Sequence, residues 1–175
     1  MHYGIIIKFT ATTTRKLPRR QFTPVGQFMK TPFSIHSQRE KRYETNLKIL
    51  EEAGVSGEDI LVCTGKGFAD SLSAAATGKA ILLVGEKLNT QQQNFIKEHA
   101  GNDYYIIGGV EAVNASVEDA VKVYGPVERI SGSDRYETSI FIAEKFFDSS
   151  ETAFVAYGGN FSDGLCGGPL AMSKK

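Results

Sequence analysis

The stretch from Glu128 to Thr138 reads Glu-Arg-Ile-Ser-Gly-Ser-Asp-Arg-Tyr-Glu-Thr, and it contains the start of a repeat. Its last four residues, 135–138, repeat residues 42–45 at an offset of 93 residues. Four more identities keep this offset: Gly65 with Gly158, Phe68 with Phe161, Asp70 with Asp163 and Leu72 with Leu165. A constant offset without a gap over about thirty residues indicates an internal repeat. The sequence therefore predicts one whole module over 42–133 and the opening part of a second over 134–175.

Charge is distributed unevenly along the 175 residues. The segment 1–39 holds seven basic side chains and no acidic one, and it is rich in Thr, Arg and Pro. We expect this basic leader to be disordered or loosely attached, with a transit peptide as the open alternative. The remainder, 40–175, carries 13 basic and 20 acidic side chains, a net charge of −7. This excess of acid argues against nucleic acid as a partner, because nucleic-acid binding needs a basic footprint.

The sequence lacks the common signatures of catalysis, metal binding and membrane insertion. His2 and His36 lie in the leader, and His99 ends a predicted helix. Cys63 and Cys166 have no CxxC spacing and no histidine nearby, so we expect both to be small core residues. Neither of the common nucleotide-binding motifs, GxGxxG after a strand or GxxxxGK[ST], is present. No apolar run approaches the roughly 18 residues of a membrane span. No export signal is visible. We predict no catalytic residue, no metal, no cofactor and no membrane partner.

Short apolar runs alternate with helical patterns from Arg42 onward. Three apolar runs, 60–63, 81–84 and 104–107, have the length of buried parallel strands, and 127–130 is predicted to be a short fourth strand. The first predicted helix ends at Gly54, and a capping box formed by Thr90 and Gln93 is predicted to open the helix after the second strand. This alternation predicts an α/β fold with a parallel sheet and right-handed crossovers, a Rossmann- or flavodoxin-like three-layer module.

The second copy is predicted to supply only a helix over 136–147, a strand over 153–157 and the start of another helix. One strand cannot form a sheet, and an unpaired strand edge recruits other chains. We therefore expect this strand either to pack on the first module's sheet or to self-associate, which would make the protein a homo-oligomer.

Each of the four predicted strands runs into a glycine at its C-terminal end. These glycines are Gly65, Gly85, Gly108 and Gly132. In an open parallel sheet those ends share one edge, where loops and helix N-termini form a ligand crevice, and glycine permits close backbone approach there. Two interpretations remain open: a ligand crevice at this edge, or glycines that serve only the turns.

Charged residues recur beside these glycines in both copies. Asp70 and Asp163 follow the glycine loop, either to favour the dipole of the next helix or to contact a ligand or a neighbouring module. Arg42 and Arg135 place positive charge at the positive end of a helix, which is mildly unfavourable and indicates another role. That role is either pairing with one of these aspartates or holding an anion alongside backbone N–H groups. Asp134 is predicted to begin the helix that contains Arg135.

Three motifs carry a family resemblance. They are Arg129-Ile130-Ser131-Gly132-x-Asp134-Arg135-Tyr136-x-Thr138-Ser139, Gly65-x-Gly67-Phe68-x-Asp70-x-Leu72, and Ile106-Ile107-Gly108-Gly109-x-x-Ala112-Val113. Together they resemble the clostridial-type cell wall binding repeat, the second class of such repeats, over about 42–175. The resemblance implies a non-catalytic, surface-located module that anchors wall proteins to an anionic wall polysaccharide. It also implies three tandem repeats packed as a pseudo-trimer, so neighbouring repeats of the same family are expected partners.

The residues expected to bind the ligand lie mostly at strand ends. They are Arg129, Ser131, Gly132, Asp134, Arg135, Gly108, Gly109, Asp70 and Asp163. Two functions from other classes stay open: a small α/β enzyme or nucleotide-binding domain that uses the glycine edge, and a purely structural repeat that packs only on its neighbours.

Overall fold

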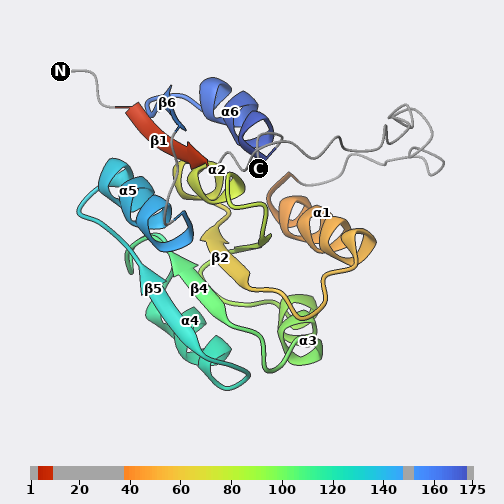
Figure 1. The fold of residues 1–175 in the computed structure, drawn as a ribbon. Coiled ribbons are helices and arrows are strands. Elements are labelled where there is room, and N and C mark those ends of the chain that lie inside the picture. The colour runs from red at the N-terminus through yellow and green to blue at the C-terminus, as the bar shows by residue number, and fades with distance from the viewer. Residues whose placement is uncertain (1–3, 10–37, 148–151, 173–175) are drawn as a thin grey trace.

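The computed structural model describes residues 4–9, 38–147 and 152–172 (Figure 1). The helices and strands are β1 (Gly4–Phe9), α1 (Gln38–Ala53), β2 (Ile60–Thr64), α2 (Ala69–Ala75), β3 (Ala80–Val84), α3 (Thr90–Glu98), β4 (Tyr104–Ile107), α4 (Ala115–Lys122), β5 (Val127–Ile130), α5 (Arg135–Phe146), β6 (Thr152–Tyr157) and α6 (Ser162–Met172).

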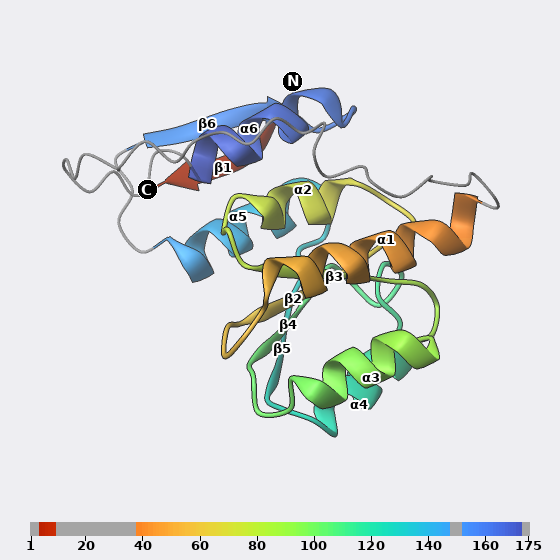
Figure 2. The ribbon, with the colours of Figure 1, turned by 90° about the vertical axis from the view of Figure 1, so that its right-hand side faces the viewer.

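Strands β2 to β5 form the central sheet, and all are parallel, in the order β3-β2-β4-β5. The predicted α/β fold with a parallel sheet is therefore confirmed. Helices α1, α3 and α4 cover one face of the sheet, and α2 and α5 cover the other (Figure 2). The strand order reverses between β2 and β4, the flavodoxin-type position at which ligands of such sheets bind.

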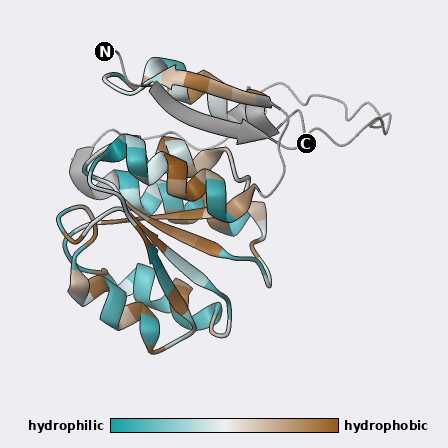
Figure 3. Cartoon of the chain, turned by 60° about the vertical axis from the view of Figure 1, so that its left-hand side comes forward, coloured by the Kyte–Doolittle hydropathy of each residue, from teal (hydrophilic) through white to brown (hydrophobic). Residues whose placement is uncertain are grey.

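Alternate residues of β2, β3 and β4 enter two separate cores, which explains their apolar runs, seen as brown strand segments in the middle of the molecule in Figure 3. In β2, Ile60 and Val62 pack towards α1, α3 and α4, whereas Leu61 and Cys63 pack towards α2 and α5. Burying side chains of this size contributes roughly 1.5–3 kcal/mol each. Burial, with a smaller contribution from Asp70, raises the pKa of Cys63, so its thiol stays protonated and unreactive.

The prediction that both cysteines lie in the core is wrong for Cys166, which is exposed. In the second copy, α6 turns Gly164 and Gly168 towards Leu72 and Ala75 of α2. A residue two positions from both glycines lies on the opposite side of the helix, which places Cys166 away from this contact.

Helix α3 is capped one residue earlier than predicted. The side chain of Asn89 accepts a hydrogen bond from the Gln92 amide at 2.8 Å, and Gln92 Oε1 accepts one from the Asn89 amide at 2.9 Å. Thr90 therefore lies inside the helix, because asparagine is at least as good an N-cap as threonine. Gln92 also donates to the Leu83 carbonyl at 2.7 Å and so fixes the helix to β3.

The second copy reproduces the start of the first. Helix α2 begins at Ala69 and α6 at Ser162, and these positions differ by the repeat offset. The first helix of each copy also makes the same contact: Arg42 donates to the Gly65 carbonyl, and Arg135 donates to the Gly158 carbonyl at 3.0 Å.

Strand β6 does not join the four-stranded sheet. It pairs antiparallel with β1, from Gly4 opposite Tyr157 to Phe9 opposite Thr152, and the two strands lie over α2 and α5 (Figure 2). The expectation that 1–39 lacks structure is therefore wrong for Gly4–Phe9 and for Gln38 and Arg39, which begin α1, and residues 1–3 and 10–37 lie outside the described residues. Residues Gly4–Phe9 form a strand because β6, if left unpaired, would have unsatisfied backbone hydrogen-bonding groups. The β-prone segment around Ile5–Ile7 can satisfy them.

Helix α5 serves both copies. Ile142 enters the core between the first sheet and α2, and Phe147, which caps α5, packs with Ala76 and Ala156 beneath the β1–β6 pair. The position equivalent to Ile142 in α1 is Ile49. Ile49 is 61% exposed, whereas Ile142 is 1% exposed.

This difference yields a matched test of stability. Ile142→Ala should lower the free energy of unfolding by about 2–4 kcal/mol, because it leaves a cavity in the core. Ile49→Ala should change it by less than about 0.5 kcal/mol. Urea unfolding followed by circular dichroism measures both values. Equal effects would contradict the role of α5 as the cover of the first sheet.

Candidate functional site

A cavity of about 590 Å³ opens at the C-terminal edge of the sheet, where β2 and β4 end. Three segments line it: the loop after β2 with the start of α2, the loop after β4, and the start of α5. It lies at the point where the strand order reverses. Of the residues predicted to bind a ligand, the structure places these in the cavity wall: Asp70, Gly108, Gly109, Gly132, Asp134 and Arg135. Arg129, Ser131 and Asp163 do not line it.

Gly108 is required for this geometry by two features. Its φ of +99° is a backbone conformation that side chains disfavour. A Cβ atom at this position would also lie 2.6 Å from Asp70 Oδ2. The glycine therefore allows the loop after β4 to approach the carboxylate of α2.

Asp70 lies in the first turn of α2, as predicted, and its side chain is half-buried. Burial raises the pKa of its carboxyl group, and the nearby Arg135 guanidinium offsets part of this rise. Within the described part of the chain, its carboxylate accepts no hydrogen bond and forms no ion pair. Its acceptor oxygens therefore remain available to hydroxyl or N–H donors of a ligand.

Arg135 projects from the first turn of α5 at the rim of the cavity. Its guanidinium donates to the Gly158 carbonyl and lies 5.7 Å from the centre of the Phe68 ring, within the range of a cation–π interaction. Among the described residues it forms no ion pair with Asp70 or Asp163, so the first of its two expected roles, pairing with an aspartate, is replaced by a carbonyl contact. A carbonyl just beyond a strand end has no ladder partner, which makes it a ready acceptor. The Asp163 carboxylate instead accepts from the Tyr157 amide, at 3.4 Å.

Asp134 caps α5, as predicted, and its Oδ1 accepts from the amides of Tyr136 and Glu137 at 2.8 and 2.9 Å. Its position in the cavity wall is therefore explained by capping.

Arg129 supports the cavity from behind. It donates to Glu118 Oε2 from Nε at 2.8 Å and from Nη2 at 2.6 Å. It also donates to the carbonyls of Gly108 at 2.7 Å and Val113 at 3.0 Å, and its side chain is 17% exposed. Hydrogen bonds from Lys122 and then from Arg129 lower the pKa of Glu118. The guanidinium thus fixes both ends of the loop after β4 and has a structural role.

Three residues of this loop that line the cavity have backbone N–H groups without a described partner. The Ala112 and Val113 amides both donate to the Gly109 carbonyl at 3.0 Å, which folds the loop into a turn. The backbone N–H groups of Gly109, Val110 and Glu111 donate to no other described residue. Successive free N–H groups of this kind form anion-binding concavities.

Sequence reasoning missed Lys66 and Phe68, which also line the cavity. Lys66 is ion-paired with Glu86 at 2.8 Å. The ring of Phe68 contacts the ring of Phe161 edge-on, at 6.3 Å between centroids. Since Phe161 is the repeat equivalent of Phe68, the repeat pattern contained the signal that could have identified this residue.

The described residues contain neither a cluster suited to a metal ion nor a helix suited to a membrane span. No group of three or more histidine, cysteine, aspartate or glutamate residues in 4–9, 38–147 and 152–172 is arranged to hold a metal ion. No helix in those ranges is both long and apolar enough to cross a membrane.

Comparison with known proteins identifies one family and several relatives. The family described as cell wall binding domain 2 (CWB2) matches residues 40–118 and 129–175. The N-acetylmuramoyl-L-alanine amidase LytC of Bacillus subtilis (strain 168) is 29% identical over 139 residues, which are 77% of this chain and 27% of LytC. The amidase enhancer of the same organism is 31% identical over 137 residues, which are 76% of this chain and 18% of that protein. The chain thus spans less than a third of either relative.

Two solved structures share the fold. Cwp8 from Clostridium difficile has a TM-score of 0.63 and 25% identity over 76% of this chain and 24% of its own. Cwp6 from the same organism has a TM-score of 0.64 and 21% identity over 76% and 23% of the two chains.

The two arginines predicted to bind the ligand should differ in their effect on stability. Arg129→Ala should lower the free energy of unfolding by about 3 kcal/mol, because it leaves Glu118 half-buried with one partner fewer and releases the loop after β4. Arg135→Ala, at an exposed position, should cost less than about 1 kcal/mol. Chemical unfolding of the two variants gives the comparison, and similar losses would refute the structural assignment of Arg129.

Asp70 should make stability depend on pH. Since its folded-state pKa is raised, the ionised carboxylate is disfavoured in the folded state, and this cost is present at neutral pH. The cost disappears as the pH falls through the folded-state pKa towards the ordinary value of 3.8. Asp70→Asn should therefore unfold at a higher temperature than the parent at pH 7, and the difference should vanish near pH 4. A variant that is less stable at pH 7 would contradict this account.

Proposed function

The chain belongs to the cell wall binding domain 2 family, and we propose that it is a non-catalytic module that anchors a surface protein to an anionic polysaccharide of the bacterial cell wall. The family membership, the relation to cell wall proteins and the cavity at the sheet edge support this role. We place the module at the cell wall of a Gram-positive bacterium. Any catalytic activity of a longer parent protein would then reside outside the residues matched here.

The convergence of ligand-binding groups in the 590 Å³ cavity carries the proposal. Arg135 and the free N–H groups of Gly109–Glu111 suit the acidic groups of a wall polymer. Asp70 accepts hydrogen bonds from sugar hydroxyls. None of these groups forms the nucleophile-and-base pair that covalent catalysis requires.

The attraction to a polyanion is local. Residues 40–175 carry a net charge of −7, so the module as a whole repels a polyanion. Of the two basic residues in the cavity wall, Lys66 is already paired with Glu86. Arg135 therefore carries most of the cationic contribution, and the interaction is short-ranged.

Neighbouring repeats of the same family are the second class of partner. Phe68 contacts its own equivalent Phe161, and a Cβ atom on Gly168 would meet the Cβ of its equivalent Ala75 at 3.3 Å. Equivalent residues touch each other only near an axis that relates the two copies. In the second copy, Phe161 is 53% and Leu165 is 56% exposed, and this apolar surface suits a further repeat.

Wall binding should decrease with salt and with the loss of Arg135. The Debye length falls from about 10 Å at 0.1 M to about 3 Å at 1 M ionic strength, so retention on purified walls should weaken over that range. Arg135→Ala should weaken binding about tenfold, because a hydrogen bond to a charged group contributes about 1.5–3 kcal/mol. Arg42→Ala is the matched control, since Arg42 makes the equivalent carbonyl contact but does not line the cavity.

The measurement is co-sedimentation with walls before and after extraction of the anionic polymer. Retention that survives the extraction, or that is equal at both salt concentrations, would refute the anionic ligand. No retention on untreated walls would leave the purely structural repeat as the better interpretation.

A further inference from the structure

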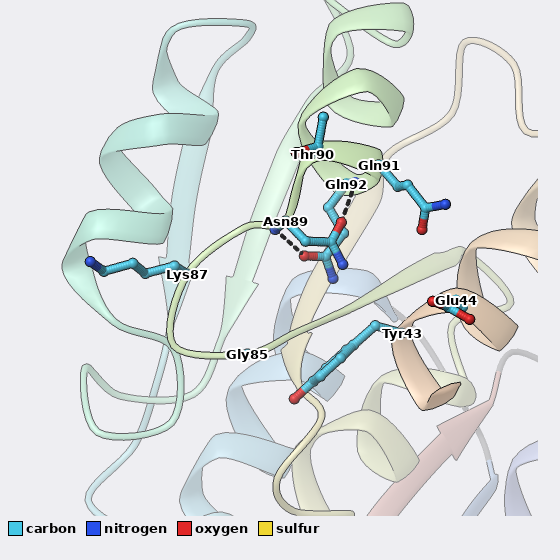
Figure 4. Close-up of a pocket in the computed structure, with 8 residues that line it drawn as sticks. All are labelled: Tyr43, Glu44, Gly85, Lys87, Asn89, Thr90, Gln91 and Gln92. Carbon is cyan, nitrogen blue, oxygen red and sulfur yellow. Dashed lines mark hydrogen bonds between the residues drawn. The ribbon is translucent and has the colours of Figure 1, made fainter. Parts of the chain in front are cut away.

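A second cavity, of about 420 Å³, opens at the same edge of the sheet, beyond the end of β3 (Figure 4). It is bounded by the first turns of α1, by the loop after β3 and by the first turn of α3. The lining residues are Tyr43, Glu44, Gly85, Lys87, Asn89, Thr90, Gln91 and Gln92.

The ring of Tyr43 forms one wall of this cavity and lies across two strand ends. A Cβ atom on Gly65 would collide with the ring, and one on Gly85 would lie 3.4 Å from the hydroxyl oxygen. The ring therefore rests against glycine backbone at the ends of β2 and β3, with its hydroxyl group close to Gly85 (Figure 4). Among the residues that the structure describes, the Tyr43 hydroxyl has no hydrogen-bond partner.

The polar groups of the cavity fall into two classes. Asn89 and Gln92 are committed to the capping box of α3 and to the Leu83 carbonyl, so they shape the wall. The side chains of Glu44, Lys87, Thr90 and Gln91 make no hydrogen bond or ion pair with another described residue. The cavity thus presents an amide, a hydroxyl and one carboxylate beside an aromatic ring, and the Lys87 side chain extends away from that ring (Figure 4).

This combination suits a sugar ring. An aromatic face offers apolar area for the C–H groups of a pyranose, and amide, hydroxyl and charged groups exchange hydrogen bonds with its hydroxyls. Glu44 is acidic and the Lys87 ammonium is directed away from the Tyr43 ring, so the wall does not attract an anionic group and an uncharged sugar is favoured here. The first cavity, with Arg135 and the free N–H groups of its loop, favours an acidic group instead.

The two cavities are neighbours along the edge. Strands β2 and β3 are directly paired, which sets them about 4.8 Å apart. The ion pair between Lys66 and Glu86 joins the loops that follow them. Lys66 lines the first cavity, and Glu86 lies between two residues that line the second. One extended polymer chain can therefore cross both.

We propose that the Tyr43 cavity is a second subsite, which takes an uncharged pyranose residue of the polysaccharide whose acidic group occupies the Arg135 cavity. This inference rests on the proposed wall-binding function and adds the chemical class of a second residue along the polymer.

The test titrates ¹⁵N-labelled protein with N-acetylglucosamine and, separately, with glucose at millimolar concentrations. Amide resonances of residues 85–92 should shift with at least one of the two sugars, and those of residues 108–111 should stay unchanged. Gln91→Ala should weaken this binding about threefold or more, and Tyr43→Leu should abolish it. The control is Asn94→Ala, an exposed residue of the same helix outside the cavity, which should have no effect.

Failure of this inference can be told from failure of the proposed function. If the protein sediments with walls but neither sugar shifts residues 85–92, or if Gln91→Ala leaves the shifts unchanged, the second subsite is refuted and wall anchoring stands. If the amide resonances of residues 85–92 shift but the protein does not sediment with walls, the anchoring function fails. The sugar then does not belong to a wall polymer, and the inference is overturned in its present form. Because Gln91 is exposed, its variant remains informative even if Tyr43→Leu is unstable.

Discussion

A parallel sheet is stable in water only when both of its faces are covered, and this constraint explains most of the architecture. The first copy provides α1, α3 and α4 for one face but only the short α2 for the other. Helix α5, which begins the second copy, completes the cover through Ile142. The structural module therefore extends one helix beyond the sequence repeat. The same helix supports the β1–β6 pair on its other side, so the two copies share part of their cores.

Once the sheet is covered, its C-terminal edge remains as the place where backbone and polar groups meet solvent. The Arg129 guanidinium donates hydrogen bonds to Glu118 and to two carbonyls and so fixes the loop after β4. At Gly108 that loop lies close to the Asp70 carboxylate. The conformation of the cavity is thus set by a residue behind it. The groups that remain available to a ligand are those without an internal partner, namely Asp70, the loop amides and the solvent-facing side of Arg135.

The strands and most helix limits were predictable because their cause is local. Continuous apolar runs mark buried strands, and a glycine with positive φ ends α1 at Ala53. Asn89 was overlooked as the cap of α3 because Thr90 offers the same chemistry one residue later. The partners of Arg129 and Arg135 were not predictable, because carbonyls are present at every position and only the tertiary structure selects one. The same applies to β1, whose partner β6 lies far along the chain and has no complementary pattern that sequence alone reveals.

The contact of Ala75 with its own equivalent, Gly168, has an evolutionary consequence. The same position of the repeat lies on both sides of such a contact, so a substitution made in both copies alters both sides at once. The contact then changes by two side chains, as at the axis of a symmetric dimer. A Cβ on Gly168 would already lie 3.3 Å from that of Ala75, so this position tolerates only the smallest residues in either copy. Positions far from the axis meet a different residue and are free to vary independently. The geometry therefore predicts which positions of the repeat must evolve together.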